Sequence, residues 1–169
     1  LVSVSDGTTI HTGLGFKFGS RKYLPLQNAK LEQFRCRFEE LEIVIMDETS
    51  MISSDQLYDI HRRMTEILLS KDLFGGRAIM LVGDILQLPP VQGRAVYSPP
   101  FSQKNRSLFY SEDNLWRNFD VVALKVNHRQ GVSQWTECLN RIRIGQLDED
   151  DRMLLESRRL KHFPNLNTN

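Results

Sequence analysis

The chain has 169 residues, of which 40% are hydrophobic and 25% are charged, and its net formal charge is +1. This length and composition suit one compact globular domain, and the near-neutral charge gives no global indication of a nucleic-acid partner. The longest apolar runs are too short for a membrane span, and two cysteines are too few for a disulfide framework.

The first part of the chain predicts a turn, a helix and a strand. Asp6-Gly7 indicates the turn. A helix is expected where Leu31, Phe34 and Phe38 recur at steps of three and four residues, a pattern that extends to Leu41. The continuously apolar run 43–46 follows, and such a run is typical of a strand buried on both faces.

A second helix and a second strand come next. Ser53 or Ser54 can cap this helix, His61 is expected on its surface, and Gly75-Gly76 is expected to break it. Its apolar stripe consists of Leu57, Ile60, Met64, Ile67 and Leu68. Residues 78–82 then predict a buried strand. Because more than ten residues separate the two strands, they predict a right-handed crossover and a parallel sheet.

The second half of the chain predicts less regular structure. Pro89-Pro90 ends the regular elements, and residues 92–114 are expected to form a loop. Residues 121–126 predict a third strand. A helix is expected at 135–142 with Trp135, Cys138, Leu139 and Ile142 on one face and Gly145 beyond its end. Asp148 and Asp151 predict a capping box for a last short helix.

Acidic side chains follow the first predicted strand. Asp47 and Glu48 stand at its carboxyl end, where open parallel sheets collect their ligands. One carboxylate there can hold Mg²⁺, which prefers hard oxygen ligands. A second can orient and deprotonate a water molecule that attacks a γ-phosphate. Any buried strand that leads into an acidic turn gives the same pattern, so the pair alone is weakly specific.

Polar side chains also follow the other two predicted strands. Gln87, in the string 83–91, is uncharged and can donate to a phosphate oxygen while it accepts from water. Arg129, just past the third predicted strand, can neutralise charge on a transferring phosphoryl group. A stiff proline-containing loop and an ordinary surface arginine are the alternative interpretations.

Positive charge is concentrated in one stretch of the sequence. Between residues 17 and 37 there are six basic residues and a single acid, Glu32. The basic residues are Lys17, Arg21, Lys22, Lys30, Arg35 and Arg37. A surface that faces nucleic-acid phosphates and an ordinary solvated surface both fit this stretch.

Several strings, in order and at matching spacings, resemble the motifs of PIF/RecD-like helicases, superfamily-one motors that move 5′ to 3′ on single-stranded DNA. Residues 7–12 resemble motif Ia, with Thr12 in place of the usual Ser; 46–51 resemble motif II; 83–91 resemble motif III; and 128–130 resemble motif IV. Residues 115–117 and 155–160 are most similar to the helicases of eukaryotic rolling-circle transposons.

The resemblance implies an α/β fold, namely a RecA-like P-loop NTPase fold with a mostly parallel sheet. It implies ATP and Mg²⁺ as cofactors and single-stranded and forked DNA as partners. By analogy, Asp47 holds Mg²⁺, Glu48 activates water, Gln87 couples the γ-phosphate to DNA, and Arg129 contacts the γ-phosphate. Thr9 and His11 contact the DNA strand, and Lys17, Arg21 and Lys22 extend that contact.

The chain departs from the family pattern in one respect. No Gly-x-x-Gly-x-Gly-Lys-Thr/Ser phosphate loop occurs in it, and without that loop phosphate affinity should be low. Residues 1–160 are therefore expected to be a partial first motor domain, incomplete because the phosphate loop and the second motor domain are missing, and inactive alone. Residues 161–169 are expected to be a severed connection to the second domain.

Two rival functions stay open at this stage. One is an ATP-independent module that binds single-stranded DNA, or a decayed helicase relic; the other is a phosphate-loop ATPase that does not act on DNA. Residues 1–7 show no signal-peptide pattern, so an intracellular location is expected, nuclear or else mitochondrial in a eukaryote.

Overall fold

A computed structural model describes residues 7–17, 22–128, 131 and 133–159, which divide into two compact units, residues 1–120 and 121–169. The first unit contains α1 (Ile10–Gly13), α2 (Asn28–Phe38), β1 (Ile43–Met46), η1 (Thr49–Met51), α3 (Ser54–Leu68), η2 (Leu73–Gly76), β2 (Ala78–Leu81), α4 (Gln103–Phe109) and η3 (Leu115–Asn118). The second contains α5 (Gln134–Arg143) and α6 (Glu149–Glu156). In the described residues no helix is long and apolar enough to cross a bilayer.

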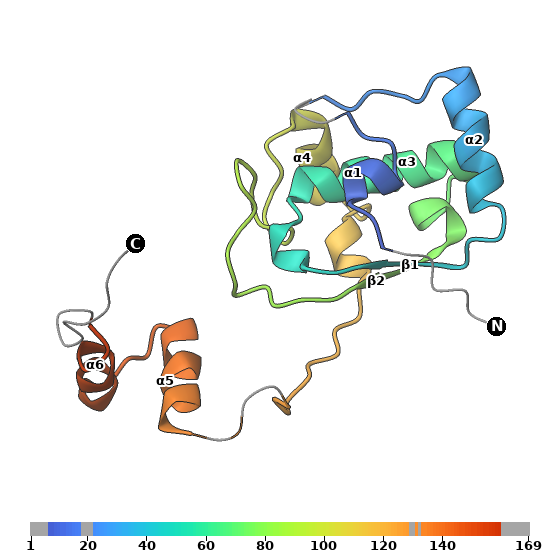
Figure 1. Cartoon of the computed structure of the whole chain (residues 1–169). Helices are drawn as coiled ribbons and strands as arrows, with labels where there is room; N and C mark the ends of the chain where they lie inside the picture. Colours follow the sequence, from blue (N-terminus) through green and yellow to red (C-terminus); the bar gives the residue numbers. More distant parts are fainter. Residues whose placement is uncertain (1–6, 18–21, 129–130, 132, 160–169) are drawn as a thin grey trace, which may run out of the picture. The chain divides into compact units, whose positions relative to one another are not determined.

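The sheet of the first unit is the predicted parallel pair. β1 and β2 pair in register from Ile43 opposite Ala78 to Met46 opposite Leu81, and α3 makes the crossover between them. Helices α1, α2 and α3 lie on one side of this sheet (Figure 1). Parallel pairing through a helical crossover therefore confirms the strand–helix–strand prediction.

The expectation that β1 is buried on both faces is wrong. Met46 is 4% exposed, whereas Ile43 and Ile45, on the opposite face, are 42% and 63% exposed. Successive side chains of a strand point to opposite faces, and the described residues cover only the face that Met46 lines. The run is continuously apolar, so its sequence does not distinguish the covered face from the bare one.

Helix α3 contributes more buried apolar side chains to the core than any other described element. Ser53 is its N-cap and accepts a hydrogen bond from the backbone N–H of Gln56 at 3.1 Å. The predicted stripe is confirmed, because Leu57, Ile60, Met64 and Ile67 are at most 1% exposed. The helix ends at Leu68 rather than at Gly75-Gly76, because Leu69 adopts a left-handed conformation with φ 53°.

His61 is not the surface residue that the helical pattern suggests. Its Nδ1 accepts a hydrogen bond from the backbone N–H of Phe74 at 3.0 Å, and its ring packs edge-on against the Phe74 ring. Burial, with the nearby Arg62 charge, lowers the pKa of His61 below 6.5. His61 therefore connects α3 to η2 as a neutral imidazole.

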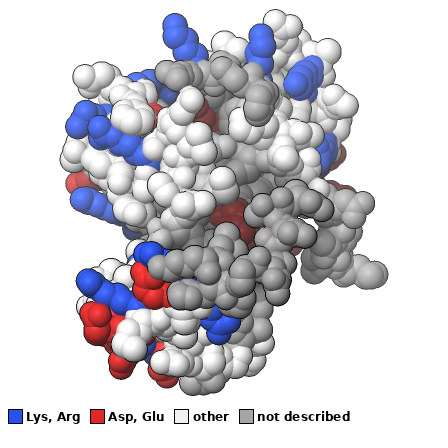
Figure 2. Space-filling model, turned by 60° about the vertical axis from the view of Figure 1, so that its left-hand side comes forward, with Lys and Arg blue, Asp and Glu red and all other residues white. Residues whose placement is uncertain are grey.

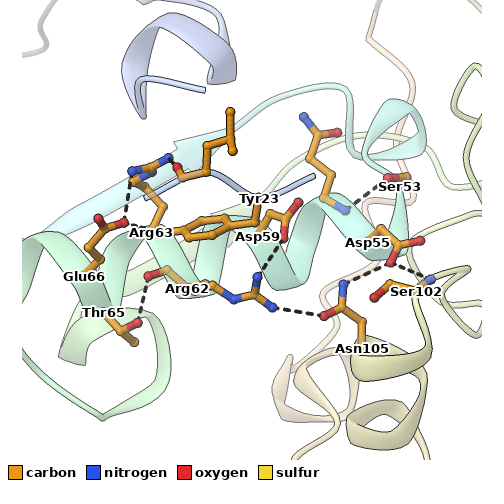
Figure 3. Close-up of polar contacts among 12 residues, drawn as sticks. Tyr23, Ser53, Asp55, Asp59, Arg62, Arg63, Thr65, Glu66, Ser102 and Asn105 are labelled. Carbon is orange, nitrogen blue, oxygen red and sulfur yellow. Dashed lines mark hydrogen bonds and ion pairs between the residues drawn. The ribbon is translucent and has the colours of Figure 1, made fainter. Parts of the chain in front are cut away.

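The polar side of α3 holds two distant segments (Figure 3). Arg63 is 1% exposed, donates to the Leu24 carbonyl at 2.7 Å and pairs with Glu66 at 3.0 Å. Glu66 also accepts hydrogen bonds from the Tyr23 hydroxyl and from the backbone N–H of Leu26. These contacts fix the chain between α1 and α2 onto α3.

At the other end of α3, Asp55 holds α4. Its carboxylate accepts hydrogen bonds from the backbone N–H of Ser102 at 3.2 Å and from Asn105 at 3.0 Å (Figure 3). It also accepts from the backbone N–H of Phe101 at 2.7 Å. Residues 92–114 are therefore only partly loop, since α4 occupies 103–109. This short helix was not predicted because its sequence has no extended apolar period.

The third predicted strand is absent. Residues 121–126 have no strand assignment, and Val121, Val122 and Leu124 are 83–90% exposed. A strand needs a neighbour to satisfy its N–H and C=O groups, and among the described residues no strand pairs with this segment. The high β-propensity of this segment predicts a strand, but propensity alone does not supply the partner strand that pairing requires.

The second unit contains two helices, α5 and α6, which are connected by an ion pair between Arg141 and Asp151. The guanidinium of Arg141 donates to both oxygens of Asp151, each at 2.7 Å, and Asp148 and Asp151 form the predicted capping box. The Arg141 hydrogen bonds hold the pKa of Asp151 well below its usual range, and burial raises the pKa of the Cys138 thiol. α5 forms where it was predicted and Gly145 follows its end with φ 70°, but of its predicted face only Cys138 is buried, whereas Trp135, Leu139 and Ile142 are exposed.

We predict that the His61 contact makes stability fall in mild acid. The folded-state pKa of His61 is depressed, so the unfolded chain binds more protons as pH falls through 6.5. Urea unfolding between pH 7.5 and 5.5 should lose no more than about 1.4 kcal/mol per pH unit from this group. His61→Asn, whose side-chain oxygen can accept the Phe74 hydrogen bond without titrating, should flatten the profile. An unchanged profile in this variant would exclude His61 as the cause.

Candidate catalytic edge and nucleic-acid groove

The loops that follow β1 and β2 are joined at the carboxyl edge of the sheet. Val82 donates its backbone N–H to the Met46 carbonyl at 2.8 Å. The Val82 carbonyl in turn accepts from the Thr49 backbone N–H at 3.1 Å and from the Thr49 hydroxyl at 2.8 Å. Thr49 is 3% exposed. The loop that carries Asp47 and Glu48 is thereby fixed to the start of the loop that carries Gln87.

Gly83 is required at this junction. Its φ is 148°, and a Cβ placed on it would lie 2.6 Å from the Thr49 backbone nitrogen. Real side chains do not approach backbone so closely, and this φ region is essentially restricted to glycine. The glycine after β2 is therefore explained by the close approach of the two loops.

Glu48 has an unusual backbone conformation for its residue type. It lies in the left-handed region, with φ 55° and ψ 50°, and its side chain is exposed. The conformation costs a residue other than glycine about 1–2 kcal/mol. Strain of this kind concentrates at functional sites. In this left-handed conformation the backbone N–H of Glu48 donates to Asp47 Oδ1 at 2.8 Å.

Gln87 is held in a tight turn after β2. Its backbone N–H donates to the Asp84 carbonyl at 3.0 Å, and its Nε2 lies 3.5 Å from Asp84 Oδ2. Asp84 also accepts from the Leu86 backbone N–H at 3.1 Å. Gln87 remains exposed beside a pocket of about 240 Å³ that Ser50 and Tyr97 help to line.

The carboxylates at this edge fit a metal ion that takes most of its ligands from elsewhere. Within the described part of the chain, no group of three or more His, Cys, Asp or Glu residues could hold a metal. Mg²⁺ usually takes one or two carboxylates and completes its shell with waters and substrate phosphates. Asp47 is exposed at the strand end, and only one of its oxygens is engaged by Glu48. This donor set suits Mg²⁺ accompanied by a phosphate ligand.

The residues expected to contact DNA lie apart from this edge or outside the described residues. Thr9 caps α1, and its hydroxyl accepts from the Thr12 backbone N–H at 3.3 Å. Lys17 and Lys22 are exposed, whereas Arg21 and the expected γ-phosphate contact Arg129 lie outside the described residues. On the face drawn in Figure 2, Lys and Arg stand in separate groups, so charge alone defines no single nucleic-acid surface.

A larger groove lies between α1 and α2. Its volume is about 640 Å³, and it includes Thr9 and His11 from the predicted DNA contact. It is lined by Thr9, His11, Thr12, Gly15, Phe16, Lys30, Gln33, Phe34 and Arg37. Sequence reasoning assigned no role to Gln33 and none to Thr49. The steps from residue 30 to 33 and 37 put the α2 residues on one helix face, a signal that charge counting overlooks.

The family model described as PIF1-like helicase matches residues 2–152. The ATP-dependent DNA helicase Pif1 of Psychrobacter sp. is 30% identical over 74% of this chain and 18% of its own length. Uncharacterized protein 030L of Invertebrate iridescent virus 6 is 31% identical over 88% of this chain and 29% of its own length.

Solved structures give the same result for the fold. The structure of Bacteroides Pif1 bound to single-stranded DNA has a TM-score of 0.64 and 27% identity, covering 88% of this chain and 35% of that one. The structure of Bacteroides Pif1 with ADP-AlF3 and single-stranded DNA has a TM-score of 0.64 and 28% identity, covering 89% and 36%. These likenesses confirm the α/β, RecA-like fold class, here as part of a domain.

The fold and the family match together define part of a helicase-type motor domain. The chain belongs to the PIF1-like helicase family. It spans 18–29% of the length of the two curated relatives named above.

We predict that Gly83→Ala separates the two loops. The new Cβ meets the Thr49 backbone rather than a flexible side chain, so the substitution should cost about 1–3 kcal/mol of unfolding free energy. Gly7→Ala is the matched control, because no atom lies within 4 Å of a Cβ there; its effect should stay within about 0.5 kcal/mol. Chemical denaturation of both variants measures the difference, and equal stabilities would mean that the loops are not held in contact.

Proposed function

We propose that this chain supplies part of the ATP-hydrolysing edge of a DNA helicase that moves 5′ to 3′ on single-stranded DNA. The observation that carries the proposal is the Gly83–Thr49 junction, which brings the acidic loop and the Gln87 loop to one edge of a parallel sheet. Such an edge is where α/β domains bind nucleotides. Family membership and the Pif1 structures with ADP-AlF3 and single-stranded DNA support it.

Each residue has a distinct proposed role. Asp47 would hold Mg²⁺, since Glu48 engages only one of its carboxylate oxygens. Mg²⁺, when bound, neutralises charge on the phosphate oxygens. Glu48 accepts a proton from the attacking water, and its exposed side chain is accessible to that water. Gln87 senses the γ-phosphate, and Arg129 contacts it. The phosphate loop that this reaction needs is not in the 169 residues.

The proposed partner is single-stranded DNA, including the single-stranded arm of a fork. Thr9 and His11 face the groove between α1 and α2, and Lys17, Arg21 and Lys22 follow them in sequence. A solved Pif1 complex described as unwinding forked double-stranded DNA covers 89% of this chain with a TM-score of 0.66. That likeness supports forked DNA as the substrate of the whole protein. The proposed site of action in a eukaryote is the nucleus or else the mitochondrion.

A second candidate function is a module that binds single-stranded DNA without ATP. The groove favours it, because none of its described lining residues comes from the loops that carry Glu48 and Gln87. The two functions differ in one measurable respect. A module binds DNA equally with and without nucleotide, whereas a motor edge joined to its phosphate loop changes DNA affinity on binding ATP.

We predict that Glu48→Gln stops hydrolysis without stopping binding. The test uses a polypeptide that carries these residues together with a phosphate loop. The amide keeps the size of the side chain but removes its basicity, so turnover should fall by about 10²- to 10⁴-fold while ATP and DNA affinities are unchanged. Steady-state ATPase and fluorescence binding measure the two effects.

Glu42→Gln is the matched control. It makes the same chemical change at an exposed glutamate beside the opposite end of β1, and turnover should be normal. Normal turnover in Glu48→Gln, or an equal loss in both variants, would refute the role of Glu48 as the base.

A further inference from the structure

The loop after β2 runs out from the catalytic edge and returns to the start of α3. Its outgoing limb, residues 82–89, is hydrogen-bonded to the acidic loop. Its return limb, residues 93–97, pairs with α3, because Ser54 donates its backbone N–H to the Arg94 carbonyl at 3.0 Å. The turn that carries Gln87 therefore lies between two points at which main chain is attached to main chain.

The return limb packs closely on the first turn of α3. A Cβ on Gly93 would lie 2.6 Å from the Cβ of Ser53, so the limb passes directly over the helix cap. Ala95 forms an antiparallel bridge with Ser53, and Val96 is 2% exposed. Pro100, which follows the limb, is fully buried, and the fixed φ of proline restricts the chain there. The return limb is therefore held by the core of the first unit.

A pocket of about 240 Å³ lies between the two limbs. Its lining is chiefly apolar and comes from both limbs and from the acidic loop, namely from Ser50, Ile85, Leu86, Gln87, Pro89, Ala95, Val96 and Tyr97. Gln87 and Tyr97 thus line one cavity from opposite limbs. Because this space lets the Gln87 turn change position without a clash, the wall opposite the turn decides how far it can move.

Gln87 is held weakly by its own turn. Its Nε2 lies 3.5 Å from Asp84 Oδ2, which is longer than the roughly 2.7–3.2 Å of a good N–H···O hydrogen bond. The Gln87 side chain is also exposed. Local contacts therefore leave the orientation of its amide loosely determined, and a rigid wall across the pocket can restrict it.

Tyr97 provides a wall whose position does not depend on the turn. Its ring is 44% exposed and packs against Trp116, with centroids 6.3 Å apart. Trp116 contacts Phe119 at 6.0 Å, and Phe119 contacts Phe74 at 5.9 Å. Aromatic rings attract one another at such separations, and Phe74 is 5% exposed. The row of four rings thus connects the pocket wall to the core.

We propose that Tyr97 is a positioning residue for Gln87. Its ring, held by Trp116, limits the movement of the Gln87 turn and so keeps the amide where it can meet the γ-phosphate. The inference rests on the proposed function for the role of Gln87, and it adds a second residue, ten positions later, on which that role depends.

The first test uses the phosphate-loop polypeptide of the Glu48→Gln experiment. Tyr97→Ala should lower kcat at saturating single-stranded DNA by about tenfold or more, toward the roughly 10²-fold that a misplacement of about 1 Å can cost. The KM for ATP should be unchanged, because the substitution leaves the proposed ATP contacts in place. Tyr110→Ala is the matched control, since it removes another exposed ring, which packs on Phe109 at the end of α4; its kcat should be normal.

Two further variants separate positioning from folding. Tyr97→Phe keeps the ring and its contact with Trp116, so kcat should return to the wild-type value. Tyr97→Leu keeps an apolar side chain but lacks the ring, so it should reproduce the loss of kcat at a normal melting temperature. If Tyr97 only filled space, Tyr97→Leu would behave like Tyr97→Phe.

The second test needs no ATP and uses the 169-residue chain. Trp116 and Trp135 are its two tryptophans, so Trp135→Phe leaves Trp116 as the only indole reporter. In that background Tyr97→Ala should increase the quenching of Trp116 fluorescence by acrylamide, because the Tyr97 ring packs on the indole. Tyr97→Phe and Tyr110→Ala should leave the quenching unchanged.

The outcomes separate this inference from the proposed function. Normal kcat in Tyr97→Ala, together with lost turnover in Glu48→Gln, would overturn the positioning role alone, and so would unchanged quenching in Tyr97→Ala. Weaker binding of oligo-dT by Tyr97→Ala, with normal kcat at saturating DNA, would show a direct DNA contact and also overturn it. A wild-type polypeptide whose ATPase does not respond to DNA would overturn both proposals.

Discussion

The structure of the first unit depends on helix α3, which contacts the sheet, the segment before α2 and the start of α4. Its apolar stripe, with Ile60 and Met64 fully buried, covers one face of the two-stranded sheet. Arg63 and Glu66 hold the segment before α2, and Asp55 holds the start of α4. Burying a guanidinium is costly unless its partners are retained. Loss of Glu66 would leave the Arg63 charge buried and less well compensated.

This arrangement connects the two sites without placing them together. The sheet fixes the catalytic edge through the Val82 and Thr49 hydrogen bonds. The groove is fixed separately, through Phe16 and the Tyr23–Leu26 segment that Arg63 and Glu66 hold. Both sites thus use α3 as a common support, although neither takes its proposed reacting groups from that helix.

Local sequence was sufficient to predict an element where that element has a regular apolar period or a capping residue. The α3 stripe, the Ser53 cap and the Asp148–Asp151 box could all be predicted, because each is decided within a few residues. The RecA-like fold class also followed from motif order. The metal, catalytic and DNA-contact roles of the site residues remain predictions.

The errors arose where distant contacts decide the outcome. His61 turns inward because Phe74, thirteen residues later, offers it an N–H. Residues 121–126 have strand propensity but no partner strand in the described residues. The Gly83–Thr49 approach is invisible in sequence, since nothing local indicates which backbone a glycine faces. The faces of β1 could not be distinguished, because all four of its residues are apolar.

The junction of the two loops also limits how they can move. Val82 donates its backbone N–H to Met46 and accepts from the backbone N–H and the hydroxyl of Thr49, so main-chain hydrogen bonds anchor each strand end to the other. A displacement of one loop relative to the other must break these bonds together. The acidic loop and the loop that carries Gln87 therefore share one fixed starting point, at Val82 and Thr49.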